Sequence, residues 1–311
     1  MTNKSEAILS EVKKVIVGKD EVVEKVFLTI LSGGHVLLED VPGVGKTTLA
    51  LAFSKAMSMS YKRVQFTPDT MASDVLGFSV YNKETGKFDY RKGAVYCNFF
   101  LGDEINRTSA KTQAALLEAM EELKITVDGK TLALPDPFVC IATQNPLGSA
   151  GTHALPDSQL DRFMVRLSLG YPSVENTVEI VKDRFGKDPL DSVSAVATTS
   201  DIVEMKEAVS KVHIDDELIE YVASLCDKTR GFTDVEQGVS PRAALATVQM
   251  AKAKAYLSGR DYVVPQDINY VFVDVCAHRV ILTPKARIKK TSAQTVLTEL
   301  LNSIPTPSPR K

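Results

Sequence analysis

Residues 37–48 read Leu37-Leu38-Glu39-Asp40-Val41-Pro42-Gly43-Val44-Gly45-Lys46-Thr47-Thr48, an apolar strand end followed by a glycine-rich turn and the start of a helix. Gly43 and Gly45 lack a Cβ, so the backbone N–H groups of the turn can approach an anion closely. Lys46 adds a positive charge for the β- and γ-phosphates, and Thr47 offers a hydroxyl to Mg²⁺. A helix is predicted from Thr47 to Met57, and its N-terminus favours the same phosphates. The stretch therefore predicts a nucleoside triphosphate site.

One position departs from the strict phosphate-loop pattern. The pattern G-x-x-x-x-G-K-[ST] has glycine where this chain has Asp40. Taken alone, the stretch is also compatible with a chance Gly-Lys-Thr turn. The segments downstream favour the phosphate loop, because they supply in order the acidic and amide side chains that such a loop needs.

Two further apolar runs end in polar side chains. The run 98–102 leads into Asp103 and Glu104, as expected of a buried strand that delivers carboxylates at its carboxyl edge. Asp103 suits Mg²⁺, and Glu104 suits orienting and deprotonating the attacking water, because phosphoryl transfer depends mainly on positioning and charge stabilisation. The alternative is an exposed acidic strand end. The run 138–142 leads toward Asn145, which we expect to hold the water beside the same edge.

These segments give the chain a resemblance to AAA+ ATPases, and within them to the MoxR family, over nearly its whole length. It is carried by the segments Glu39 to Ala50, Asp103-Glu104-Ile105-Asn106-Arg107-Thr108, Ala115-Leu116-Leu117-Glu118-Ala119-Met120-Glu121-Glu122, Ala142-Thr143-Gln144-Asn145-Pro146, Leu155-Pro156-Asp157-Ser158-Gln159-Leu160-Asp161-Arg162-Phe163 and Gly238-Val239-Ser240-Pro241-Arg242-Ala243. The Asp-Glu-Ile-Asn-Arg and Leu-Asp-Arg-Phe segments are narrower signals than the phosphate loop. MoxR-like loops often carry a non-glycine residue at the position of Asp40, so the departure fits this family.

The resemblance implies further roles. Asn145 resembles sensor 1, Arg162 the arginine finger that reaches the neighbouring subunit's γ-phosphate, and Arg242 the sensor 2 arginine, acting in its own subunit or in the next. The segment Val15-Ile16-Val17-Gly18 resembles the family's adenine-side contact. The predicted nucleotide-binding residues are thus Val17, Gly18, Pro42, Gly43, Val44, Gly45, Lys46, Thr47 and Thr48, with Thr47 and Asp103 as metal ligands.

Arg162 and Arg242 are also each compatible with a surface residue in an ion pair, which contributes under about 1 kcal/mol to stability. For Arg242 the local sequence argues otherwise. Ser240 and Pro241 predict a helix start with serine at N-cap and proline at N1, which places Arg242 in the first turn. A positive charge there opposes the helix dipole unless an anion lies nearby. The position therefore favours a phosphate partner.

The pattern along the chain predicts two domains and a tail. Residues 1–172 alternate short apolar strands with amphipathic helices, which predicts an α/β core with a parallel sheet. The expected strands are His35 to Glu39, Lys62 to Phe66, Phe99 to Leu101, Phe138 to Ala142 and Val165 to Leu169. Beyond them strands are expected to disappear, and 173–303 predicts an all-α lid domain. Its expected helices are Val174 to Phe185, Ile202 to Val212, Glu217 to Arg230, Pro241 to Leu257 and Gln266 to Arg279.

Shorter segments complete this organisation. A loop is expected around Lys187-Asp188-Pro189, and the tail 304–311 is expected to be extended or disordered. Asn3 is expected to cap a first helix. Hairpin insertions are predicted over Leu123 to Leu134, with an Asp128-Gly129 turn, and over Phe78 to Tyr90. The ordinary reading is two surface hairpins; the resemblance implies substrate or partner elements at the pore or upper surface of a ring.

Composition excludes several classes of function. The net charge of −2 gives no overall attraction to nucleic acid, and the cluster Lys83, Lys87, Arg91 and Lys92 is diluted by nearby acids. Four scattered cysteines predict buried thiols in a reducing cytoplasm, and the histidines, including His153, lack metal-ligand spacing. No apolar stretch approaches the about 20 residues of a membrane span, and no signal-peptide core is present. We expect a cytoplasmic protein without direct membrane insertion.

The sequence thus predicts a Mg²⁺-dependent ATPase. The resemblance implies a homo-oligomeric ring, a hexamer, that remodels or matures a protein client in a chaperone-like way. MoxR-like proteins commonly act with von Willebrand factor A domain partners; this sequence contains no such domain, so a separate protein is expected to supply it. Two alternatives stay open: a nucleic-acid motor or loader, stimulated by DNA in a salt-sensitive way, and the ATPase subunit of a metal chelatase, active only with its catalytic subunit and porphyrin.

Overall fold

The computed structural model describes residues 2–145, 155–183 and 188–307. Within these residues a five-stranded sheet has the order β2-β5-β8-β1-β9. Its strands are β1 (Val36–Glu39), β2 (Tyr61–Gln65), β5 (Phe99–Asp103), β8 (Val139–Gln144) and β9 (Val165–Leu167). The four pairings between them are parallel. The predicted parallel sheet is therefore confirmed, and its carboxyl ends share one edge.

The inner strands β1, β5 and β8 are mainly apolar because both faces of the sheet are covered there, whereas the edge strand β2 is largely polar. Successive side chains alternate between the faces, so Val36 and Leu38 join one apolar cluster while Leu37 joins another. The helices of this part are α1 (Thr2–Lys13), α2 (Asp20–Leu31), α3 (Lys46–Ala56), α4 (Ala72–Leu76), α5 (Ala110–Glu122), α6 (Asp157–Leu160) and α7 (Val174–Asp183). The first cluster includes buried residues of α1, α2 and α3, and the second includes buried residues of α5.

Some helix ends differ from prediction. Helix α1 begins at Thr2, so Asn3 lies in its first turn and does not precede it. Helix α3 begins at Lys46, directly after Gly45. Helix α7 ends at Asp183, and the predicted end at Phe185 lies outside the described residues, as do Lys187 and His153.

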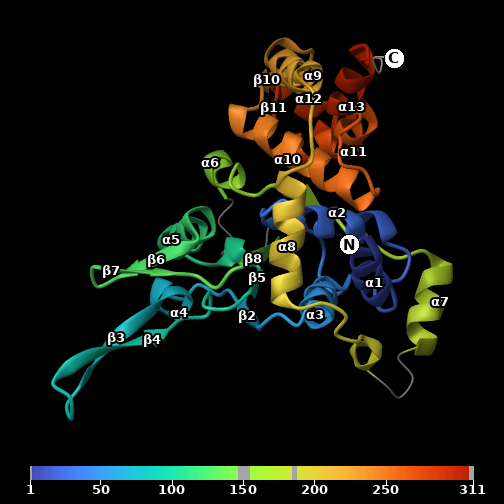
Figure 1. Cartoon of the computed structure of the whole chain (residues 1–311). Helices are drawn as coiled ribbons and strands as arrows, with labels where there is room; N and C mark the ends of the chain where they lie inside the picture. The colour runs from blue at the N-terminus through green and yellow to red at the C-terminus, as the bar shows by residue number, and fades with distance from the viewer. Residues whose placement is uncertain (1, 146–154, 184–187, 308–311) are drawn as a thin grey trace.

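Two hairpins interrupt the α/β part as predicted. They are β3 (Gly77–Asn82) with β4 (Lys87–Lys92), and β6 (Lys124–Val127) with β7 (Lys130–Ala133). Asp128 and Gly129 both have positive φ, of 50° and 75°, as a two-residue hairpin turn requires. Figure 1 shows both hairpins projecting from the same side of the molecule, away from α7.

The C-terminal part is mainly helical. Its helices are α8 (Thr199–Ser210), α9 (Asp216–Lys228), α10 (Pro241–Leu257), α11 (Pro265–Cys276), α12 (Pro284–Ile288) and α13 (Ala293–Ser303). The expectation that strands disappear here is wrong in one detail, because β10 (Val235–Gln237) pairs antiparallel with β11 (Ile281–Leu282). These strands of three and two residues are too short to show a period in the sequence. Residues 304–307 carry no helix or strand, and 308–311 lie outside the described residues.

The two parts share an apolar cluster. It runs from α1, α2 and α3 into α8, α9, α10 and α11, so the helical part lies directly on one face of the α/β part (Figure 1). The domain boundary predicted at 172 and 173 stays a prediction. The four cysteines are buried and free, as expected. In the part of the chain that the structure describes, no helix combines the length and apolar character needed to cross a membrane.

Candidate functional site

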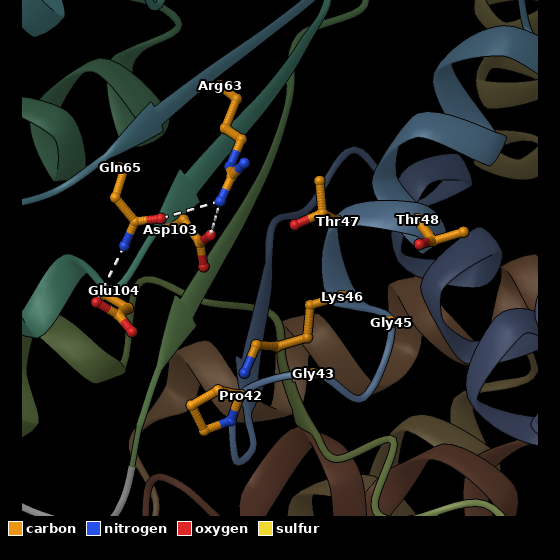
Figure 2. Close-up of a pocket in the computed structure, with 10 residues that line it drawn as sticks. All are labelled: Pro42, Gly43, Gly45, Lys46, Thr47, Thr48, Arg63, Gln65, Asp103 and Glu104. Atoms are coloured by element: carbon orange, nitrogen blue, oxygen red, sulfur yellow. Dashed lines mark hydrogen bonds and ion pairs between the residues drawn. The ribbon is translucent and has the colours of Figure 1, made fainter. Parts of the chain in front are cut away.

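A cavity opens at the carboxyl edge of the sheet, between the loop after β1 and the ends of β2 and β5 (Figure 2). It is lined by Pro42, Gly43, Gly45, Lys46, Thr47, Thr48, Arg63, Gln65, Asp103 and Glu104. The structure thus brings together the predicted phosphate loop and both predicted acids. The other predicted site residues, Val17, Gly18, Val44, Asn145, Arg162 and Arg242, are not among those that line it.

The loop needs glycine at two positions for conformational reasons. Gly43 and Gly45 have φ values of 86° and 99°, which side-chain-bearing residues rarely adopt. A Cβ at either position would meet nothing within 4 Å, so crowding is not the cause. The space beside the backbone is open, and an anion can approach its N–H groups there.

Lys46 is folded back onto its own loop. Its Nζ donates to the backbone oxygens of Asp40 at 2.8 Å and Val41 at 3.0 Å, and Figure 2 shows the side chain ending near Pro42. Burial lowers the pKa of Lys46, while the charges of Asp40, Asp103 and Glu104 oppose this shift. The ammonium must therefore leave two carbonyl oxygens to bind a phosphate.

Asp40, the departure from the strict pattern, is almost fully buried and ties the loop to the chain after β9. Its Oδ2 accepts from the Leu169 N–H at 2.7 Å. Its Oδ1 accepts from the Ser168 hydroxyl at 2.7 Å and from the Gly170 N–H at 3.0 Å. A carboxylate at this position thus accepts from three donors, which glycine could not do, and one of them belongs to the buried residue Leu169. Local sequence carries no sign of this role, because the partners of Asp40 lie about 130 residues further on.

Both oxygens of Asp103 are engaged. Oδ2 accepts from Arg63 Nη2 at 2.6 Å and Oδ1 from the Thr143 hydroxyl at 2.6 Å. Thr47 lies on the side of the loop that faces this pair (Figure 2). A hydroxyl and one carboxylate are the oxygen ligands that a phosphate-bound Mg²⁺ requires, because this ion usually keeps several waters and is held by one or two carboxylates. The residues fit Mg²⁺, which must compete with Arg63 for Asp103.

Glu104 has a left-handed backbone, with φ 56° and ψ 50°, a conformation that costs a non-glycine residue about 1–2 kcal/mol. Its N–H donates to Thr143 Oγ1 at 2.9 Å, so one hydroxyl links both acids. Its Oε2 accepts from Gln65 Nε2 at 3.0 Å and from Arg107 Nη1 at 2.8 Å. Such local strain is typical of functional sites.

Sequence reasoning missed Arg63 and Gln65. Both lie on β2, beside β5, and Gln65 is paired in register with Asp103. The signal was available, because the predicted strand Lys62 to Phe66 carries polar side chains toward its carboxyl end, where parallel strands place their functional groups.

Two predicted contacts stand apart from this cavity. Asn145 follows β8, and its backbone oxygen accepts from Asn106 Nδ2 at 3.4 Å. Gly18, with φ 69°, lies against α7, where a Cβ would come within 1.9 Å of Asn176 Nδ2. The sensor role of Asn145 and the adenine-side role of Val17 and Gly18 stay predictions.

Arg162 and Arg242 meet at one carboxylate. Arg162 Nε lies 3.2 Å from Glu121 Oε2, and Arg242 Nη2 forms an ion pair with Glu121 Oε1. Ser240 is the N-cap residue of α10, as predicted, but its hydroxyl donates to Asp161 Oδ2 at 3.2 Å and does not cap the helix. The anion that offsets the charge of Arg242 is therefore Glu121, and the inference from the helix dipole to a phosphate is not needed.

Comparisons with known proteins agree with this geometry. A family model for the ATPase family associated with various cellular activities (AAA) matches residues 35–165, and one for the AAA lid domain matches residues 228–300. The chaperone MoxR1 of Mycobacterium tuberculosis is 39% identical over 311 residues, covering 97% of this chain and 82% of that protein.

The uncharacterized protein YeaC of Bacillus subtilis is 42% identical over 302 residues, covering 97% of this chain and 94% of that protein. A solved structure from Cytophaga hutchinsonii, described as a candidate ATPase, is similar with a TM-score of 0.91 and 36% identity, covering 99% of this chain and 96% of that one.

Proposed function

The chain belongs to the MoxR family of AAA+ ATPases, and from this premise we propose that it hydrolyses ATP with Mg²⁺ in a ring of identical subunits and remodels or matures a protein client. One observation carries the proposal. The phosphate loop, Asp103 and Glu104 line one cavity, whereas Arg162 and Arg242 lie together at a different carboxylate. In the proposed ring, a second copy of the chain would bring Arg162 to the γ-phosphate, and Arg242 would act in its own subunit or in the next.

The residues of the cavity suit a division of labour. The loop N–H groups and Lys46 bind the β- and γ-phosphates, and Thr47 with Asp103 holds Mg²⁺, which neutralises phosphate charge. Water attacks the γ-phosphorus, the bond to the bridging oxygen of ADP breaks, and Glu104 accepts the proton of the water. Both described hydrogen bonds to the Glu104 side chain use Oε2, so we assign this proton to Oε1.

The ring is tested by mixing two inactive variants. Arg162→Ala should lower turnover by about 10³- to 10⁵-fold without preventing nucleotide binding, as for other arginine fingers. Mixing it with Glu104→Gln should restore activity, because an intact Glu104 in one subunit then meets an intact Arg162 from the next. Mixed rings that form without recovering activity would argue for a role within one subunit. Native mass spectrometry of the ATP-bound assembly checks for six copies.

Exposed apolar residues on the β3–β4 hairpin support a protein client. Phe78, Tyr81 and Phe88 are 50%, 53% and 65% exposed, and the rings of Tyr81 and Phe88 pack edge to face at 5.4 Å. The nearby cation Lys92 lies over the Tyr96 ring, 3.9 Å from its centroid. Such a surface favours apolar contacts over phosphate contacts, whose strength falls steeply with salt.

The client class is tested with the rate of ATP hydrolysis. We expect stimulation by a protein partner, with a von Willebrand factor A domain protein as the first candidate, and little change between low and moderate salt. Single-stranded and duplex DNA serve as comparisons. Strong, salt-sensitive stimulation by DNA alone would favour a nucleic-acid motor, and activity only with a chelatase catalytic subunit and porphyrin would favour a chelatase subunit.

A further inference from the structure

The backbone around Arg162 is held by the end of α11. The Arg279 side chain, 4% exposed, donates from Nε to Asp161 Oδ1 at 2.8 Å and from Nη2 to the Asp161 and Phe163 oxygens at 3.2 and 2.8 Å. His278 Nε2 lies 3.0 Å from the same Phe163 oxygen. The residues on both sides of Arg162 are thus fixed by buried groups, and its main chain is not free to move by itself.

The side chain of Arg162 depends on a different partner. Its guanidinium pairs with Glu121, the same carboxylate that pairs with Arg242 from the start of α10. The side chains of Glu121 and Arg162 are only 32% and 31% exposed, so solvent screens this contact less than an ordinary surface pair. Two guanidinium groups that share one carboxylate lie close together, and their mutual repulsion is offset by the charge between them.

We propose that Glu121 is a positioning residue: its carboxylate holds Arg162 and Arg242 side by side so that both are oriented before they meet a γ-phosphate. This inference rests on the proposed ring, in which that phosphate belongs to the neighbouring subunit. Each arginine has a long side chain whose rotamer freedom is costly to remove at the moment of reaction. If both side chains are already ordered before the reaction, less entropy is lost on reaching the transition state, and its free energy is lower. This is the general benefit of preorganised charge.

Two other readings make different predictions. A structural ion pair would affect folding or assembly and leave the turnover of assembled rings unchanged. A competing counter-ion, which the phosphate must displace, would make turnover rise when Glu121 is neutralised. The sign of the change in turnover therefore separates these readings from positioning.

The test compares Glu121→Gln with Glu122→Gln, a matched control. Glu122 is the next residue of α5, is 50% exposed and pairs with Lys124 at 3.2 Å, and neither described ion pair of the two arginines involves it. We expect kcat of Glu121→Gln to fall by at least about tenfold, since tenfold is the rate equivalent of ordering one of the two long side chains. Nucleotide affinity, ring assembly and the melting temperature should stay close to those of Glu122→Gln.

A double variant gives a readout that a structural role would not produce. If Glu121 acts through the arginines, adding Glu121→Gln to Arg162→Ala should lower kcat less than Glu121→Gln does in the wild-type chain. Unchanged or raised turnover, loss of assembly, or a fall in the double variant as large as that caused by Glu121→Gln in the wild-type chain would each overturn the inference. Wild-type turnover in Arg162→Ala itself would overturn both this inference and the proposed role of Arg162. If Arg162→Ala loses turnover while Glu121→Gln keeps wild-type turnover, only the inference about Glu121 is overturned.

Discussion

Replacing Asp40 by glycine would restore the strict phosphate-loop pattern, and we expect it to damage the protein. The substitution removes one buried carboxylate and with it the hydrogen bonds to Ser168 Oγ and to the Leu169 and Gly170 N–H groups. The sequence pattern alone predicts a neutral or improved loop. The structure predicts the opposite, because the N–H group of the buried residue Leu169 loses its acceptor, and Ser168 and Gly170 lose a charged partner.

The magnitude follows from those three contacts. A hydrogen bond to a charged group contributes about 1.5–3 kcal/mol, and an unpaired buried donor costs about 1–3 kcal/mol. Relief from burying the carboxylate offsets part of this loss, while the greater freedom of an unfolded glycine adds about 0.5–1 kcal/mol. We expect Asp40→Gly to lower the free energy of unfolding by about 3 kcal/mol. An unfolding entropy of about 2.1 cal/mol/K per residue over 311 residues corresponds to about 1.5 °C per kcal/mol, so Tm should fall by about 5 °C.

Differential scanning calorimetry of the nucleotide-free protein measures this change. Asp40→Asn is the matched control, because it keeps the shape and one acceptor oxygen and should lose roughly half as much. A Tm of Asp40→Gly within about 1 °C of wild type, less than 1 kcal/mol on the same scale, would refute the reasoning. Nucleotide affinity of the folded variant would then show whether Asp40 instead affects the loop directly.

Three further predictions concern the cavity and the core. Lys46→Ala should abolish ATP binding, whereas Glu104→Gln should bind ATP normally and lose turnover, since Glu104 acts only during the reaction. Titration with a fluorescent nucleotide measures the affinity, and an equal loss of affinity in both variants would contradict the assignment. Arg63→Met should lower the Mg²⁺ concentration for half-maximal hydrolysis by up to about fivefold, because Arg63 no longer competes for Asp103; an unchanged or higher requirement counts against that competition. Burial lowers the pKa of His35 from its ordinary 6.5 to about 4. As the pH falls from 6.5 toward 4, the unfolded chain therefore binds a proton before the folded chain does, and the free energy of unfolding decreases. On the order of 2 kcal/mol should be lost between pH 7 and pH 5 from this group, and His35→Gln should show a correspondingly weaker pH dependence in urea unfolding.

The sequence predicts most of the fold because its signals are local. The central strands β1, β5 and β8 are short, mainly apolar runs, and the phosphate loop and the pair Asp103 and Glu104 are contiguous segments at or directly after the ends of such runs. Helix α13 was not predicted, although the sequence contains a helix-start signal for it. Ser292 is a residue type that caps helices and accepts from the Thr295 N–H at 3.0 Å, and the buried residues Val296 and Leu300 are four apart. The strands β10 and β11 had none, because two or three residues cannot establish a period.

The rest of the site depends on contacts between distant segments. Glu121 and Arg242 are 121 residues apart, and Arg279 reaches Asp161 across 118 residues. Nothing in the local pattern distinguishes Glu121 from Glu122, since both are acids at the end of one helix. The hydroxyl of Ser240 likewise follows tertiary packing, because it donates a charge-assisted hydrogen bond to Asp161, which lies 79 residues away in the sequence.

Helix α5 begins shortly after Glu104 and ends at Glu122, so it spans from the proposed general base of one nucleotide site to the carboxylate at Arg162. Its 13 residues span about 20 Å. In the proposed ring, this helix would set the distance between the base of one active site and the arginine that serves the next. One residue inserted into it would rotate Glu121 by about 100° around the helix axis. A change in the length of the β6–β7 hairpin, which follows α5, would leave the position of Glu121 on the helix unaltered.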